Sequence, residues 1–198
     1  HRPAPVQPHY LSYPGTMGAE FIDYIIADAV TVPAAHFATY AGQMIHLPGS
    51  YQCNDARRDA GARLFTRAEA GLPENGFVFA CFNNAYKLAP DMFARWMRIL
   101  AAVDGSVLWL LEDSPVAAMH LRREAEARGI AASRLVFAPR MGPADHLARH
   151  RLADLFLDTQ PYGAHTTASD ALWAGLPVLT LEGESFAGRV AASLLHAA

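Results

Sequence analysis

The feature that most restricts the fold of this 198-residue chain is an alternation of apolar runs and amphipathic segments that begins near residue 77. Short apolar runs are typical of buried strands, and the segments between them space their apolar residues as a helix does. Such an alternation predicts a parallel sheet with helices on both faces, which is an α/β fold. The expected strands are 77–82, 106–111, 134–139, 153–158 and 177–181, and the expected helices are 90–103, 114–129, 143–151, 166–175 and 184–195.

The part of the chain before this alternation is less regular. Prolines and glycines between residues 11 and 18 predict a loop. Apolar runs at 21–28 and 43–48 predict two strands, and Thr31 ahead of a proline predicts a helix over 33–42. A polar stretch then ends in glycine and proline, so we place a domain boundary between residues 74 and 75.

Composition excludes several classes of protein. With 52% hydrophobic and 18% charged residues, the chain suits a globular protein with a sizeable core. A net charge of −3 without a basic run gives no reason to expect nucleic acid or an anionic membrane as a partner. The two cysteines lack zinc-site spacing, and we expect a cytoplasmic protein. The first residue is not Met, so we expect the chain to begin inside a longer protein.

Ligands of parallel sheets bind at the carboxyl ends of the strands, which directs attention to the loops that follow them. After the strand at 153–158, a loop with proline and glycine leads to His165, Thr166 and Thr167 at the start of a helix. A helix start attracts anions, so these residues predict a phosphate site, although an ordinary threonine cap beside a surface histidine is the alternative. Lys87 follows the first strand and is either a second phosphate contact or a solvated lysine.

Other candidates are weaker when taken singly. His146 and Arg149 are three residues apart and share a helix face, which could contact a base or simply face solvent. Asp170 lies one turn into the threonine helix, where it could accept a ribose hydroxyl or merely favour the helix dipole. Asp55 is a lone carboxylate in a polar loop. The tryptophans fit packing in the core or between helix and sheet better than ligand stacking.

Common catalytic signatures are missing from the sequence. No glycine-rich dinucleotide or P-loop motif is present, and neither is a zinc-protease motif or a nucleophile elbow. A D-x-D motif, a usual site for a divalent metal, is also missing. We therefore expect no metal and no cofactor, so that protein groups alone would neutralise a bound diphosphate.

Taken together, residues 7–28, 82–103, 106–111 and 152–195 resemble the catalytic region of the protein O-GlcNAc transferases and their bacterial homologues. The resemblance implies a GT-B architecture of two Rossmann-like lobes. Residues 1–74 would end the N-terminal lobe, and residues 75–198 would form most of the donor-binding lobe, incomplete at its C-terminus. It also implies inverting, metal-independent transfer of GlcNAc from UDP-GlcNAc to Ser or Thr of proteins, and tetratricopeptide repeats upstream that present the protein acceptor.

The resemblance assigns roles to the candidates one by one. Diphosphate contacts fall on Lys87, His165, Thr166 and Thr167, uridine contacts on His146 and Arg149, the ribose on Asp170, and proton acceptance on Asp55. Asn84 stands where the animal enzymes have a glutamine beside the diphosphate, and Pro143 stands where they have a lysine, which removes one expected base contact.

The sequence also allows two other functions. One is a related enzyme, either a protein O-fucosyltransferase that uses GDP-fucose or an N-glucosyltransferase that uses UDP-glucose. The other is a non-catalytic Rossmann-like module that binds a nucleotide or a partner protein.

Overall fold

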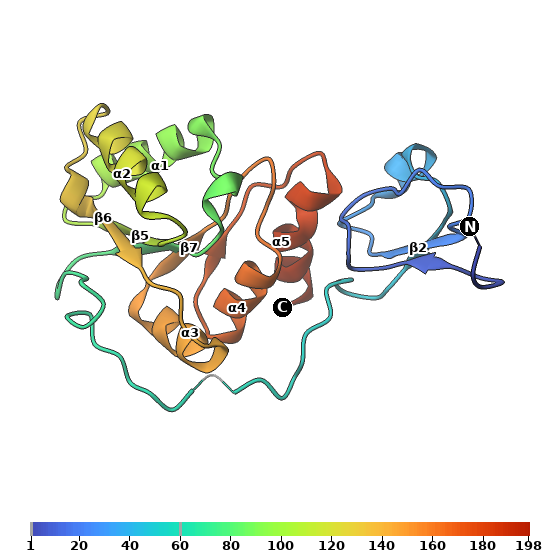
Figure 1. Ribbon diagram of the computed structural model, residues 1–198, viewed down its shortest axis with the longest axis horizontal. Helices are drawn as coiled ribbons and strands as arrows, with labels where there is room; N and C mark the ends of the chain where they lie inside the picture. Colours follow the sequence, from blue (N-terminus) through green and yellow to red (C-terminus); the bar gives the residue numbers. More distant parts are fainter. Residues whose placement is uncertain (1, 60) are drawn as a thin grey trace.

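The computed structural model describes residues 2–59 and 61–198, and it contains two parallel sheets (Figure 1). The first sheet has the order β1-β2-β3, and the second has the order β6-β5-β4-β7-β8. All neighbouring strands are parallel, which confirms the α/β fold class. The strands are β1 (Pro8–His9), β2 (Tyr24–Ala27), β3 (Gln43–His46), β4 (Val78–Cys81), β5 (Val107–Leu111), β6 (Leu135–Ala138), β7 (Leu155–Leu157) and β8 (Val178–Leu179).

Helices connect the strands of the second sheet. In Figure 1, α1 and α2 lie on one side of this sheet and α3 and α4 on the other, while α5 lies between the sheet and the N-terminal part of the molecule. Proline in the first turn of α1, α2 and α3 presets the backbone for a helix start. The α-helices are α1 (Pro90–Ala102), α2 (Pro115–Glu126), α3 (Pro143–Arg149), α4 (Thr166–Trp173) and α5 (Phe186–Ala197), and the 3₁₀ helices are η1 (Ala34–Thr39), η2 (Ala85–Lys87), η3 (Ala132–Arg134) and η4 (His150–Leu152).

We call residues 2–51 the N-terminal unit, residues 52–76 the connecting segment and residues 77–198 the C-terminal unit. The larger core belongs to the C-terminal unit, where every residue of β4 is buried. Helix α1 buries Phe93, Trp96, Met97 and Leu100 in that core. Their three- and four-residue spacing is the apolar stripe that predicts the helix from sequence.

The order of the second sheet reverses between β4 and β7. From β4 the chain moves outward through β5 to β6, and it then returns to place β7 on the opposite side of β4. At such a reversal the loops after the two central strands diverge and leave a crevice. The residues that follow these strands still meet at its base, because the Asn83 side chain donates a 2.8 Å hydrogen bond to Oγ1 of Thr159.

Helix α5 joins the two units, although it is the last element of the chain. Its residues Phe186 and Val190 pack with Ala27, Val32 and Tyr51 in a second, smaller core. The rings of Tyr51 and Phe186 meet edge to face, with their centroids 4.9 Å apart. The N-terminal unit therefore completes its apolar core with residues of the C-terminal unit.

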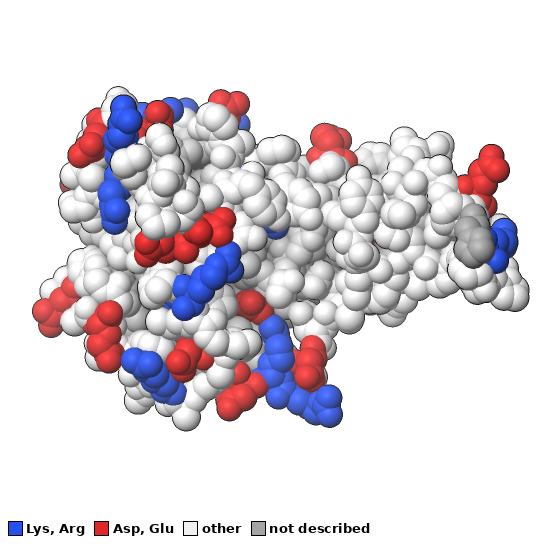
Figure 2. Space-filling model, in the orientation of Figure 1, with Lys and Arg blue, Asp and Glu red and all other residues white. Residues whose placement is uncertain are grey.

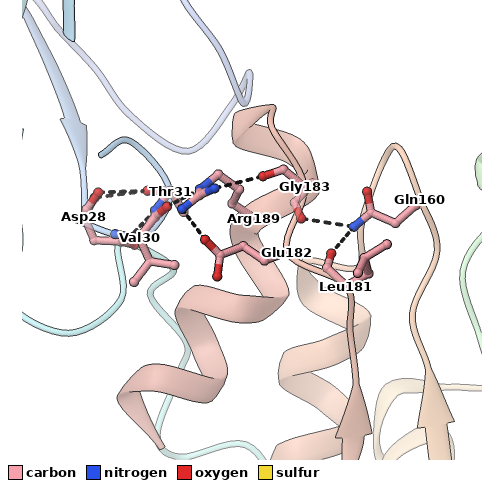
Figure 3. Close-up of polar contacts among 9 residues, drawn as sticks. Asp28, Val30, Thr31, Gln160, Leu181, Glu182, Gly183 and Arg189 are labelled. Carbon is pink, nitrogen blue, oxygen red and sulfur yellow. Dashed lines mark hydrogen bonds and ion pairs between the residues drawn. The ribbon is translucent and has the colours of Figure 1, made fainter. Parts of the chain in front are cut away.

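Polar contacts reinforce this junction (Figure 3). Arg189 of α5 donates from Nε to the carbonyl of Val30 at 2.6 Å and from Nη1 to the carbonyl of Gly183 at 2.9 Å, and it also pairs with Glu182. Nearby, Ser193 donates to the fully buried carboxylate of Asp28 at 2.7 Å. The two units are thus tied by hydrogen bonds to backbone and side chain as well as by apolar packing.

Some sequence predictions are wrong in detail. The helix expected over 33–42 is the six-residue 3₁₀ helix η1, and none of its residues is buried. Without a buried stripe, little favours a longer α-helix there. The strand expected at 177–181 pairs only at Val178 and Leu179. Trp173, expected to pack in the core, is 41% exposed, whereas Trp96 and Trp109 are buried as expected.

Charge is unevenly distributed on the face that Figure 2 draws. Acidic and basic side chains are interspersed over the C-terminal unit, while the N-terminal unit shows few of either sign. Within residues 2–59 and 61–198, no helix is long and apolar enough to cross a membrane.

Candidate functional site

A cleft of about 630 Å³ opens at the carboxyl ends of the second sheet. Its walls come from the loops after β4 and β6, from the last residue of β5, from α3 and α4, and from the connecting segment. Several of the residues singled out from sequence meet there, namely Asn84, His146, Arg149, Thr166 and Asp170. The lining is Arg58, Asp59, Phe82, Asn84, Leu111, Arg140, Met141, Pro143, Ala144, His146, Leu147, Arg149, Thr166 and Asp170.

Arg149 and His146 form the floor of the cleft at α3. The Arg149 side chain is almost fully buried, lies 4.6 Å from the centroid of Phe82 and donates to the carbonyl of Pro139 at 2.6 Å. Its Nη2 lies 2.6 Å from Nδ1 of His146. Burial, with further contributions from His150 and Arg149, lowers the pKa of His146 to about 3. His146 is therefore neutral at pH 7 and accepts a hydrogen bond from the guanidinium, so a solvated polar face is excluded for this pair.

Lys87 lies beside the loop that leads into α4. Its ammonium donates to the carbonyl of Gly163 at 2.9 Å and lies 4.3 Å from the centroid of the Tyr162 ring. Burial lowers the pKa of Lys87, while the nearby carboxylate of Asp158 acts in the opposite direction. The ammonium is half-buried rather than freely solvated, and an anion bound beside it would restore its pKa.

Asp158 organises the loop at 159–164 and was not singled out from the sequence. Its Oδ1 accepts hydrogen bonds from the backbone N–H groups of Thr159 and Ala164, both at 2.6 Å, and its Oδ2 accepts one from Thr180 at 2.7 Å. Burial raises the pKa of this carboxyl group against those hydrogen bonds. The available signal was an Asp at the start of a loop, because Asp side chains in turns bond to backbone groups nearby in the chain.

The start of α4 differs from an ordinary threonine cap. His165 occupies the cap position, and no side chain caps the helix. The first N–H groups of a helix have no intrahelical partner, so they remain available to a ligand. Thr166 faces the cleft, and Thr167 donates to Oδ1 of Asn83 at 2.5 Å.

His165 is held by contacts with α5 and with the loop that precedes α4. Its Nε2 lies 3.1 Å from the carbonyl of Ala187, which requires Nε2 to be the donor, and its ring stacks on Tyr162 with centroids 5.1 Å apart. Burial lowers the pKa of His165 to about 4. The alternative of a solvated surface histidine is therefore excluded.

The two candidate carboxylates have different surroundings. Asp170 lines the cleft and pairs with Arg58, a residue not singled out from the sequence. The side chain of Asp55 is 55% exposed, contacts Arg57 and does not line the cleft. The structure therefore brings Asp170 to the other candidates but leaves Asp55 apart from them.

Comparisons with known proteins agree on one family. The model of glycosyl transferase family 41 matches residues 1–60 and 59–198. A protein of Arabidopsis thaliana described as a probable UDP-N-acetylglucosamine–peptide N-acetylglucosaminyltransferase, SEC, is 39% identical over 98% of this chain and 20% of its own length. The corresponding transferase of Caenorhabditis elegans is 41% identical over 68% of this chain and 12% of its own length.

A solved structure is also similar to nearly the whole chain. A point mutant of the O-GlcNAc transferase of Thermobaculum terrenum superposes with a TM-score of 0.86 at 36% identity, over 98% of this chain and 36% of that one. The chain thus spans about a fifth of the length of the plant protein and about a third of the bacterial structure.

Proposed function

The chain belongs to glycosyl transferase family 41, and on that basis we propose that it forms the donor-binding part of an enzyme that transfers GlcNAc from UDP-GlcNAc to Ser or Thr hydroxyls of proteins. The observation that carries the proposal is the convergence of Lys87 with the start of α4. The ammonium bonds to Gly163, two residues before the cap residue His165, at the reversal of the sheet. A cation and an uncapped helix start at one crevice suit a diphosphate.

In the proposed reaction, the acceptor oxygen bonds to the anomeric carbon as the bond from that carbon to the diphosphate breaks. UDP leaves with the bonding electrons, and the configuration of the anomeric carbon inverts. Negative charge grows on the diphosphate, where the Lys87 ammonium and the N–H groups at the start of α4 would stabilise it without a metal ion. Donors already in place lower the barrier most effectively, because they need no reorganisation during the reaction.

The nucleoside would occupy the cleft of about 630 Å³. Neutral His146 and the buried Arg149 would contact the uracil edge, with one ring nitrogen of the histidine already engaged by the guanidinium. Asp170 would accept a ribose hydroxyl, and Asn84 would lie near the diphosphate. Pro143 begins α3 at the rim and offers no charged group to the base.

The hydroxyl proton must pass to a base as the new bond forms. Asp55 is the carboxylate proposed from the resemblance, and its exposed position would require the connecting segment to move or the acceptor to approach it. Replacement of Asp55 with Asn in the whole protein should lower the transfer rate without changing UDP affinity. Unchanged transfer would assign the base elsewhere.

The remaining parts of the proposal concern the longer protein. Tetratricopeptide repeats upstream of this region would present the protein acceptor, and the enzyme would act in the cytoplasm. Neither nucleic acid nor membrane is proposed as a partner.

The proposal is tested by calorimetry of the full-length protein with UDP, UDP-GlcNAc and GDP, and by transfer assays with UDP-GlcNAc and UDP-glucose. We expect UDP and UDP-GlcNAc to bind and GDP to bind far more weakly. Tighter binding of GDP would favour a fucosyltransferase, and transfer from UDP-glucose in place of UDP-GlcNAc would favour a glucosyltransferase. Binding of none of the nucleotides would leave a partner-binding module as the better explanation and would overturn the proposal.

A further inference from the structure

The connecting segment forms one wall of the cleft, since Arg58 and Asp59 line it together with residues of α3 and α4. Gly61 seats this segment on α3. Its φ is +68°, and a Cβ at this position would lie 2.8 Å from the carbonyl oxygen of Ala144. A side chain would not fit there without movement of the backbone, so glycine allows the segment to lie directly on the helix.

Arg58 reaches from this wall to α4. Its Nη1 pairs with Oδ1 of Asp170, and its guanidinium carbon lies 5.3 Å from the centroid of the Trp173 indole. The two paired side chains are only 23% and 13% exposed. Nε and Nη2 of Arg58 are buried and have no hydrogen-bond partner among the described residues. Within that part of the chain, Asp170 is therefore the one acceptor of this guanidinium, and its position depends on the carboxylate.

The same contact determines which oxygen of Asp170 is free to bind a ligand. Arg58 occupies Oδ1, while Oδ2 has no hydrogen-bond partner in residues 2–59 and 61–198. The arginine also offsets a negative charge that would otherwise repel an anionic ligand in the cleft. A carboxylate fixed through one oxygen keeps a single orientation and retains the other oxygen for a ligand.

We propose that Arg58 is a positioning residue of the donor site, which holds Asp170 so that its second oxygen accepts a ribose hydroxyl of the nucleotide. This inference rests on the proposed function, because it requires a nucleoside diphosphate in the cleft. It assigns a part of donor recognition to the connecting segment, outside the C-terminal unit that forms the other walls.

Calorimetry of the full-length protein with UDP, 2′-deoxy-UDP and 3′-deoxy-UDP tests this role. A hydrogen bond to a charged group predicts that the unsubstituted chain prefers UDP over one deoxy analogue by roughly ten- to a hundredfold. Asp170→Asn and Arg58→Met should each reduce that preference to within about threefold of unity. Arg58→Lys should restore part of it, because lysine supplies one charged donor to Asp170 but no planar group to stack on Trp173.

Arg98→Met is the matched control, since it removes an equal charge from the exposed surface of α1. It should leave the preference for UDP unchanged. Native preference in Arg58→Met, or equal weakening of UDP and both analogues, would overturn the positioning role while leaving UDP binding itself intact. Failure of the unsubstituted chain to bind UDP would instead overturn the proposed function and this role with it. If Arg58→Met does not fold, Arg58→Lys takes its place in the same assay. A preference for UDP that is reduced but still above unity supports the role, whereas native preference or equal losses for all three ligands contradict it.

Discussion

Mild acid should destabilise this protein through His150. The side chain is fully buried, Nδ1 donates to the carbonyl of His146 at 2.7 Å, and Nε2 is buried without a partner among the described residues. Burial, together with the charge of Arg149, lowers the pKa of His150 to about 4. Protonation would place a second charge beside that arginine in an apolar site, so the native state resists it.

The direction and size of the effect follow from proton linkage. The unfolded chain binds a proton at His150 with a pKa of about 6.5, whereas the native chain does so only near pH 4, so acid favours unfolding between those values. At pH 5 the difference amounts to about 2 kcal/mol of lost stability, and at pH 7 it is negligible. The loss saturates below the native pKa.

Urea unfolding at pH 7 and pH 5 measures the total acid-induced loss, to which His146 and His165 also contribute, and a substitution at His150 isolates its share. Asparagine can keep the donor to the carbonyl of His146 but does not titrate, so His150→Asn should reduce the acid-induced loss by about 2 kcal/mol relative to the unsubstituted chain. His120→Asn, at an exposed position on α2, is the matched control and should reproduce the unsubstituted loss. Equal losses for the unsubstituted chain and His150→Asn would refute the reasoning.

Three further predictions follow from contacts already described. Lys87→Met in the whole enzyme should lower the transfer rate by ~10²–10³, as loss of one preorganised donor does, and unchanged turnover in a steady-state assay would contradict its role. Arg189→Met removes a charged donor from the carbonyl of Val30 and should lower the free energy of unfolding by about 2 kcal/mol. Proteolysis of the connecting segment should also become faster. Unchanged stability and unchanged proteolysis would show that this contact does not stabilise the junction of the two units. Gly76→Ala adds a Cβ 2.5 Å from the carbonyl oxygen of Gly105 at a φ of +123°. Thermal unfolding should therefore show a destabilisation of more than about 1 kcal/mol. An unchanged melting temperature would show that the backbone at this turn adjusts to the side chain.

The elements with one buried stripe were predictable from sequence, and those without one were not. Phe93, Trp96 and Leu100 fix the register of α1 because their spacing can bury one face only as a helix. The region around η1 lacks that constraint. Pro33 precedes the first residue of η1, and no residue of η1 is buried, so no apolar face extends it into the expected helix over 33–42.

The candidate site was predictable where its residues follow strands in sequence. Asn84, Lys87 and Thr166 stand directly after buried strands or begin a helix, and parallel topology brings such positions to one edge. Arg58 could not be found this way, because its partner Asp170 is 112 positions distant and the segment between strands carries no periodic signal. Trp173 likewise packs against the guanidinium of Arg58 from another segment rather than in the core.

Helix α5 has a consequence for how the protein is made. Phe186 and Val190 complete the small core around Val32, and Ser193 satisfies buried Asp28. A ribosome synthesises residues 24–51 long before these three, so the nascent N-terminal unit has a gap in its interior until α5 emerges from the exit tunnel. Chains interrupted before residue 186 would therefore keep an exposed apolar face on the N-terminal unit, which is the kind of surface that chaperones bind.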